Sequence, residues 1–232
     1  MNRSQPIVGF LLGATRKQIL TMKIIVITLP DFIVGEAAVI EQLLRHGVWA
    51  VHLRKPQSDS RDMARLIEEI PEICRPKIVL HDHFDLCEPY GLKGIHLNRR
   101  NPIAPEGHRG SCSKSTHSLD ELKAAKPLMD YVFLSPIFDS ISKQGYRSTF
   151  SEQQLRQAHE EGIIDGRVIA LGGVTTEKLQ QVADYGFGGA AMLGDVWKHA
   201  QERNFENYMQ QLEQWANRKG GMKGNSSGAI SL

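Results

Sequence analysis

The sequence predicts a single domain of the α/β class, a (β/α)8 TIM barrel. Short runs rich in β-branched residues alternate with longer amphipathic runs, which is the pattern of repeated βα units around a parallel sheet. Eight such units fit into residues 22–219, and a chain of 232 residues has the usual length of one barrel. The third, sixth and seventh strands are almost continuously hydrophobic, as strands buried on both faces require.

The strands and helices are bounded by ordinary start and end signals. The predicted strands are residues 23–28, 50–54, 77–81, 94–97, 110–115, 131–135, 168–171 and 190–193. Pro102 and Pro105 exclude a long helix after the fourth strand, so a loop is expected there. Apolar residues at helical spacing predict helices over residues 35–46 and 60–70. Capping residues predict three more: one that starts after a capping box of Ser118 with Glu121, one over 152–161 after Ser151, and one from Thr175 to Tyr185. A last helix is predicted over 205–219.

Composition limits the kinds of partner. The net charge is only +2 and the basic residues are scattered, so no nucleic-acid partner is expected. The apolar run at residues 7–12 is too short to cross a membrane, and no membrane partner is expected. Three widely spaced cysteines argue against a disulfide framework and favour a reducing cytoplasm. A homo-oligomer is compatible with the sequence.

Both ends of the chain differ from the barrel region. Residues 1–21 read as an extension that is disordered or lies upstream of the functional start, because Met22 directly precedes the first strand. Residues 220–232 are rich in glycine and serine and read as a disordered tail.

Polar residues follow most of the predicted strands. In barrels the reactive side chains lie at the C-terminal ends of the strands, so these positions are the candidate site. They are Arg54, Lys55, His81, Asp82, His83, Asn98, Arg100, Ser115, His117, Ser140, Ser142, Lys143, Gly172, Gly173, Gly194 and Asp195.

The last two strands end in glycine-containing turns, VIALGGVTTEKL and MLGDVW. Glycine permits close backbone approach, and free N–H groups near the start of a helix attract phosphate. Adjacent turns of this kind predict a phosphate site, which barrels commonly form after their seventh and eighth strands. The alternative is that Gly172 and Gly173 only make a tight turn.

Strand ends along the whole barrel resemble those of the thiamine phosphate synthase/TenI family. The similar segments are VHLRKP (51–56), VLHDHFDL (79–86), GIHL (94–97), STHS (115–118), DYVFLSPIFDSISK (130–143), IALGGV (169–174) and GFGGAAMLGDV (186–196). The resemblance implies a phosphorylated thiazole substrate. It assigns the phosphate to the amide of Gly173, to Gly194 and Asp195, and to a loop in which Ser140, Ser142 and Lys143 correspond to T-x-T-K.

The diphosphate half of the site departs from the synthase pattern. In a synthase two aspartates hold Mg²⁺, and the resemblance places Asp82 at the first position but neutral Asn101 at the second. The synthase Q-x-R-E-K motif appears here as His52, Leu53, Arg54, Lys55 and Pro56, and His81 replaces the Asn before the aspartate. Arg99 and Arg100 stand nearby and could compensate for a missing metal.

These departures favour a TenI-like thiazole tautomerase, which needs no cofactor. Tautomerisation moves a proton between two atoms, and histidine titrates near neutrality. His117 is the candidate acid/base and His52 a second member or orienting group, although each could instead be a satisfied structural histidine. The alternatives are a thiamine phosphate synthase, which would use Mg²⁺ through Asp82, and a non-catalytic thiamin phosphate-binding regulator. A zinc site at His81 and His83 lacks a third ligand at a recognisable spacing.

Overall fold

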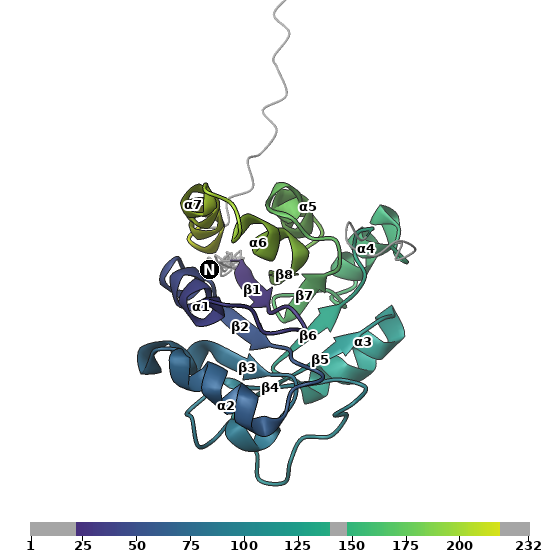
Figure 1. Ribbon diagram of the computed structural model, residues 1–232. Coiled ribbons are helices and arrows are strands. Elements are labelled where there is room, and N and C mark those ends of the chain that lie inside the picture. The colour runs from purple at the N-terminus through teal and green to yellow at the C-terminus, as the bar shows by residue number, and fades with distance from the viewer. Residues whose placement is uncertain (1–21, 140–147, 219–232) are drawn as a thin grey trace, which may run out of the picture.

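The protein is a closed barrel of eight parallel strands surrounded by helices (Figure 1). A computed structural model describes residues 22–139 and 148–218. Each strand pairs with its neighbour in sequence, and β8 closes the barrel against β1 with Ile24 beside Ala190. The strands are β1 (Lys23–Ile27), β2 (Ala50–Leu53), β3 (Ile78–Leu80), β4 (Gly94–Leu97), β5 (Ser111–Thr116), β6 (Tyr131–Leu134), β7 (Val168–Leu171) and β8 (Gly189–Met192). The predicted TIM-barrel fold is therefore confirmed, with every strand end within one residue of its expected position.

The outer helices bury one apolar face against the strands. They are α1 (Glu36–Arg45), α2 (Ser60–Glu69), α3 (Leu119–Ala125), α4 (Glu152–Glu160), α5 (Leu179–Asp184), α6 (Gly194–His199) and α7 (Phe205–Ala216). Short 3₁₀ segments are η1 (Glu72–Lys77), η2 (Phe84–Leu86), η3 (Lys126–Leu128) and η4 (Thr176–Lys178). In α1, for example, Ile40, Leu43 and Leu44 are buried because i, i+3 and i+4 share one face.

Two helix starts differ from the prediction. The hydroxyl of Ser118 accepts from the amide of Glu121, but the Glu121 carboxylate accepts from the amide of His117, so no reciprocal capping box forms. Thr175 starts the 3₁₀ segment η4 without a side-chain cap bond, and α5 follows as a separate helix. The predicted cap at Ser151 does form a full capping box, with Gln154 as its partner.

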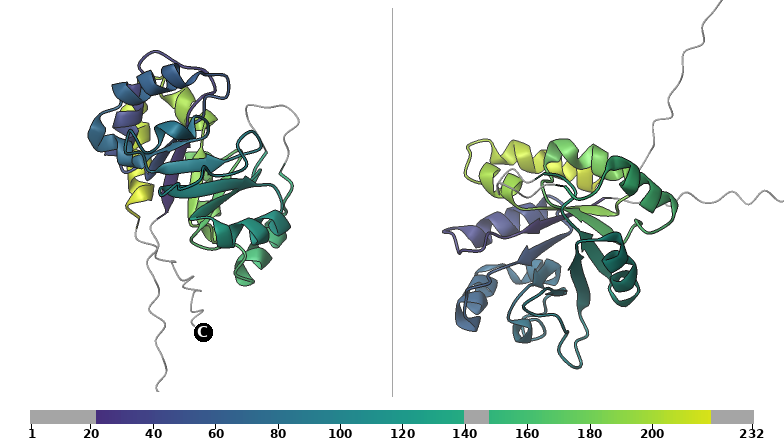
Figure 2. Two further views of the ribbon diagram at one scale, coloured as in Figure 1. Left: turned by 90° about the horizontal axis from the view of Figure 1, so that it is seen from below. Right: turned by 90° about the vertical axis from the view of Figure 1, so that its right-hand side faces the viewer.

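The part of the barrel near β3 and β4 carries little helix. As expected from its prolines, the segment between β4 and β5 is a loop, and β3 is followed only by η2 (Figures 1 and 2). The ends of β3 and β4 are therefore followed by loops without an α-helix.

The barrel interior has an apolar half and a polar half. Side chains from β1, β6, β7 and β8 form an apolar cluster, which comprises Ile25, Ile27, Tyr131, Phe133, Ile169 and Ala191. The strands β2, β4 and β5 instead contribute hydrogen-bonded polar side chains, which are His52, His96, Ser113 and Ser115. A larger core lies between the strands and the helices.

Some expectations fall outside the described residues. These are the statements about residues 1–21 and 220–232 and the phosphate contacts of Ser140, Ser142 and Lys143. Within the described chain, every helix is too short or too polar to span a bilayer.

Candidate active site at the barrel mouth

Three buried histidines from consecutive strands meet inside the barrel. His52 Nδ1 lies 2.9 Å from His81 Nε2, and His52 Nε2 lies 2.9 Å from the hydroxyl of Tyr131. The His96 ring stacks on His81 with centroids 4.2 Å apart. Its two nitrogens lie 2.8 Å from the hydroxyls of Ser113 and Ser115. The result is a continuous polar network beneath the barrel mouth.

These histidines are neutral at physiological pH. Burial lowers the pKa of His52 and of His81 well below the usual value, and the neighbouring His96 lowers both further. Burial alone lowers the pKa of His96 to about 3. Neutral imidazole and serine hydroxyl can each donate and accept, so the network is satisfied without any charge.

The same cluster is the one group of three potential His, Cys, Asp or Glu metal ligands in the described chain. One nitrogen from each of His52, His81 and His96 lies within 4.8 Å of the others. Zinc ligation at about 2.0–2.1 Å would require these nitrogens to converge and to give up their present hydrogen bonds. His83, which the sequence paired with His81, instead contacts Ser58 through Nε2.

A second polar group lies above the histidines, at the ends of β3 and β4. Asp82 Oδ1 accepts from Nε (3.1 Å) and Nη2 (2.9 Å) of Arg100, and Oδ2 accepts from the same Nη2 at 3.1 Å. Asn101 donates its amide to Asp82 Oδ1 at 3.1 Å. Both oxygens of this carboxylate are therefore engaged by neighbouring side chains.

Asn98 holds the loop that carries Arg100. Its Oδ1 accepts from the backbone amides of Arg100 (2.9 Å) and Asn101 (3.2 Å). Its Nδ2 donates to the carbonyl oxygens of His81 and His96. This single side chain ties the β4–β5 loop to two strand ends, so Arg100 is positioned before any ligand arrives.

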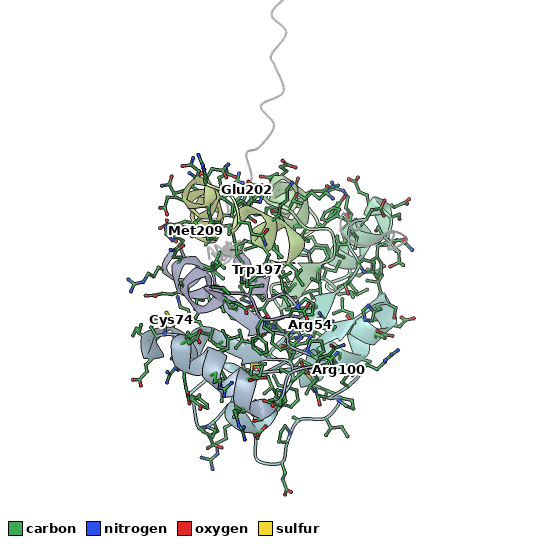
Figure 3. All side chains as sticks on the ribbon, viewed as in Figure 1. Arg54, Cys74, Arg100, Trp197, Glu202 and Met209 are labelled. Carbon is green, nitrogen blue, oxygen red and sulfur yellow. The ribbon has the colours of Figure 1, made fainter. Side chains whose placement is uncertain are left out.

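Arg54 stands beside this group at the end of β2 (Figure 3). It is half-buried, and no hydrogen bond or ion pair of its guanidinium occurs within residues 22–139 and 148–218. Burial lowers the pKa of Arg54, the positive charge of Arg100 lowers it further, and Asp82 opposes the shift. Two guanidinium groups therefore lie near one carboxylate, which is paired with Arg100, and this leaves the region positively charged and suited to an anion.

Lys55, the next residue, was expected at the binding site, but its side chain lies in a buried ion pair. Its side chain is completely buried, and its Nζ lies 2.7 Å and 2.8 Å from the two carboxylate oxygens of Glu36. It also donates to the carbonyl oxygens of Leu29 and Asp31. These contacts use all its donors, so Lys55 fastens the β1–α1 loop to β2 instead of facing a ligand.

The turn after β7 is packed against the segment after β6. Gly172 and Gly173 have φ angles of 95° and 62°. A Cβ on Gly172 would come within 2.8 Å of Pro136 Cα, and one on Gly173 would collide with the carbonyl oxygen of Asp139. Glycine is therefore required here by the fold itself, which agrees with the alternative that these residues make a tight turn.

The turn after β8 begins α6 at Gly194. The carboxylate of Asp195 accepts from the buried Tyr208 hydroxyl of α7 at 2.8 Å and from the amide of Thr176 at 3.3 Å. The Asp195 side chain thus links the turns of β7 and β8 to the C-terminal helix. The hydroxyl of Thr175 is buried and has no partner among the described atoms.

His117 lies at the end of β5 and is exposed. Its Nδ1 lies 3.1 Å from the carbonyl oxygen of Ser135 and 3.3 Å from the hydroxyl of the same residue. In the tautomer that donates Nδ1–H to the carbonyl oxygen, the ring lone pair is on Nε2. Ser115, by contrast, directs its hydroxyl to His96 inside the barrel.

The structure brings together His52 and His81 in one group and Asp82 and Arg54 in another. The sequence reasoning did not single out His96 or Tyr131, nor the partnership of Glu36 with Lys55. Alternation along GIHL and YVFL was a signal for the first two, because every second residue of a barrel strand faces inward. Nothing in the local sequence marks the Glu36 partnership.

Comparison with known proteins identifies the family. The family model described as thiamine monophosphate synthase matches residues 25–196, which is most of the chain. The chain belongs to this family. A thiamine-phosphate synthase of Koribacter versatilis is 26% identical to it over 175 residues, which cover 72% of this chain and 82% of that protein.

Solved structures agree with the assignment to the thiamine monophosphate synthase family. The crystal structure of a thiamine phosphate pyrophosphorylase from Bacteroides thetaiotaomicron has a TM-score of 0.76 and 40% identity, covering 84% of this chain and 98% of that one. A thiamine phosphate pyrophosphorylase from Pyrococcus furiosus, at 19% identity and a TM-score of 0.67, shares the fold over 85% of this chain and 96% of that one.

The residues of this family member do not fit the Mg²⁺ expected for a synthase. Mg²⁺ requires oxygen ligands at about 2.0–2.1 Å, and the oxygens of Asp82 are already taken by Arg100 and Asn101. Asn101 directs its amide nitrogen, which is no metal ligand, toward the carboxylate. In the described ranges, Asp82 also belongs to no cluster of three potential ligands.

Proposed function

We propose that this chain is a transferase of the thiamine-phosphate synthase type, which joins a pyrimidine diphosphate to thiazole phosphate and releases pyrophosphate. The observation that carries the proposal is the half-buried guanidinium of Arg54, which lies beside Arg100 and has no hydrogen-bond or ion-pair partner in the described part of the chain. We assign a single phosphate to the turns after β7 and β8, where barrels commonly bind one, whereas Arg54 and Arg100 follow β2 and β4. A second anion-binding group fits a reaction with two phosphorylated substrates.

The reaction requires one bond to break and one to form. The C–O bond between the pyrimidine methylene group and the diphosphate breaks, and its electron pair leaves with pyrophosphate. The lone pair of the thiazole nitrogen then forms the new C–N bond. Arg54 and Arg100 would stabilise the charge that develops on the leaving group, because guanidinium donates two parallel hydrogen bonds to phosphoryl oxygens.

The histidine network suits such a dissociative step. Positive charge develops on the pyrimidine methylene group as the C–O bond breaks, and a charged imidazole nearby would oppose it. His52, His81 and His96 stay neutral because burial lowers each pKa. We assign the thiazole phosphate to the amides of Gly173 and Gly194, as the family resemblance implies, with Asp195 fixing the second turn.

The names of the relatives support this reaction over the thiazole tautomerase that the sequence alone favoured. The relatives reported above are named thiamine-phosphate synthase or thiamine phosphate pyrophosphorylase, names that describe the transferase. The tautomerase stays as a second candidate because of one observation. Nδ1 of His117 is held by a carbonyl oxygen, which leaves Nε2 as a base at the end of β5.

Two assays on the purified chain separate the candidates. In the first, thiazole phosphate and the pyrimidine diphosphate are mixed with the protein, and thiamin phosphate and released pyrophosphate are measured. In the second, isomerisation of the thiazole carboxylate phosphate is followed by NMR without the pyrimidine. We expect equal amounts of thiamin phosphate and pyrophosphate in the first assay, and strong loss of turnover in Arg54→Ala but not in Arg109→Ala, an exposed arginine of the β4–β5 loop.

The other possible results of these assays would assign a different function to the chain. Turnover only in the second assay would replace the transferase with the tautomerase. Tight binding of thiamin phosphate without turnover in either assay would identify a binding protein without catalytic activity.

A further inference from the structure

The strongest departure from a metal-dependent site is the pairing of Asp82 with Arg100. In this geometry Oδ1 accepts three hydrogen bonds and Oδ2 accepts one, and the Asp82 side chain is 10% exposed. A cation could reach this carboxylate only by displacing Arg100, a bidentate partner held in place through its own backbone by Asn98. The pairing therefore competes directly with metal binding.

The same pairing leaves part of Arg100 available. The carboxylate engages Nε and Nη2, whereas Nη1 has no partner in the described parts of the chain. The Arg100 side chain is 43% exposed. An anion at the barrel mouth can therefore bind the free edge of Arg100 while the opposite edge stays on Asp82.

Arg54 supplies the second positive group. It is half-buried, pairs with no carboxylate of residues 22–139 and 148–218, and is repelled by Arg100. Two guanidinium groups against one carboxylate amount to about one excess positive charge in a partly desolvated site, where charge interactions are stronger than in water. A polyphosphate group removes this repulsion and satisfies the unused donors.

We propose that this chain binds the diphosphate group without Mg²⁺, with Arg54 and the free edge of Arg100 in the place of the metal ion. The inference rests on the proposed transferase function, because it concerns the diphosphate of that reaction. Asp82 is then a positioning residue: it holds Arg100 toward the ligand, and Asn101 in turn holds Asp82.

The direct test is calorimetric titration of the EDTA-treated full-length protein with inorganic pyrophosphate, with and without Mg²⁺. We expect binding without the metal, and a change of less than about threefold in affinity when Mg²⁺ is added. A site that depends on the metal would bind pyrophosphate only when Mg²⁺ is present, and that result would overturn the inference.

The matched variants are Arg100→Ala, Arg100→Gln and the control Arg109→Ala, which removes the same charge from an exposed position of the same loop. We expect both Arg100 variants to lose at least about tenfold in metal-free affinity. Because they release the Asp82 carboxylate, they should also gain a dependence on Mg²⁺, and the added change Asp82→Asn should abolish that gain. Equal affinities for Arg100→Gln and Arg109→Ala, with both variants folded by circular dichroism, would refute the role of Arg100.

Failure of this inference is distinguishable from failure of the proposed function. Thiamin phosphate formation that stops in EDTA, together with pyrophosphate binding only in Mg²⁺, would leave the transferase intact and remove the metal-free site. Metal-free pyrophosphate binding without any thiamin phosphate would leave the arginine site intact and remove the transferase.

Discussion

At the scale of single residues, one glycine in the turn after β7 is needed for the backbone conformation and is also proposed to bind phosphate. Gly173 has a φ of 62°, and a Cβ there would collide with the carbonyl oxygen of Asp139. Gly91 has the same φ of 62° but open space around it.

We expect Gly91→Ala to cost about 1–2 kcal/mol in unfolding free energy from backbone strain alone. Gly173→Ala should cost more and also weaken thiazole phosphate binding, as urea unfolding and calorimetry would measure; equal losses would show that the close approach is unimportant.

A second residue-scale prediction concerns His117. If Nε2 acts as a base on the thiazole, His117→Asn should lower isomerisation by about 10²–10⁴-fold. It should affect thiamin phosphate formation far less, because the bond changes of that reaction need no proton transfer. His46→Asn is the control, since the His46 ring, at the end of helix α1, lies by the carbonyl oxygen of Gln42 and the carboxylate of Glu206. Parallel assays of both reactions give the comparison, and equal losses in the two would argue against the base role.

At the scale of elements, the buried pair of Lys55 and Glu36 connects β2 to the start of α1. Lys55→Met would leave the Glu36 carboxylate buried without a partner, and we expect a loss of about 3–5 kcal/mol in unfolding free energy. Adding Glu36→Leu should recover most of this loss, because both charges are then gone. Urea unfolding of the single and double variants measures the coupling. Arg45→Met, which breaks the exposed pair with Glu41 on the same helix, should change stability little.

The loops at this end of the barrel are organised by side chains from other elements. Asn98 fastens the β4–β5 loop to β3, and Asp195 fastens the β7 and β8 turns to α7 through Tyr208. These contacts hold the candidate binding groups on rigid strands, so a ligand meets a site that is already formed. Pre-organisation of this kind reduces the entropy lost on binding.

At the scale of the whole molecule, the histidine network makes stability depend on pH. His52, His81 and His96 have pKa values below those of the unfolded chain, so the unfolded state binds more protons in acid. Their contribution is fully present above about pH 6.5 and is lost as the pH falls below that value, in the case of His96 toward its folded-state pKa of about 3. In this acid range the slope is at most about 4 kcal/mol per pH unit for three groups.

The contribution of His96 to this pH dependence can be measured by comparing the unaltered protein with the variant His96→Gln. We expect the slope of unfolding free energy against pH, measured by urea denaturation between about pH 6 and pH 4, to be smaller in the variant by up to about 1.4 kcal/mol per pH unit, the contribution of one titrating group. Carboxylates contribute equally to both proteins and cancel in the comparison. Identical slopes would mean that His96 becomes protonated in the folded state.

The sequence by itself determined the barrel and which residues stand at its strand ends. Strands buried on both faces must be hydrophobic runs, and turns such as the one at Gly173 must contain glycine, so local patterns mark both. Only the tertiary structure decided what the polar residues do. Lys55 contacts Glu36, Asp82 contacts Arg100, and His52 contacts Tyr131, and all three contacts join residues distant in the chain. Ion pairs and hydrogen bonds depend on which groups the closed barrel brings within about 3 Å, and no local pattern encodes that distance.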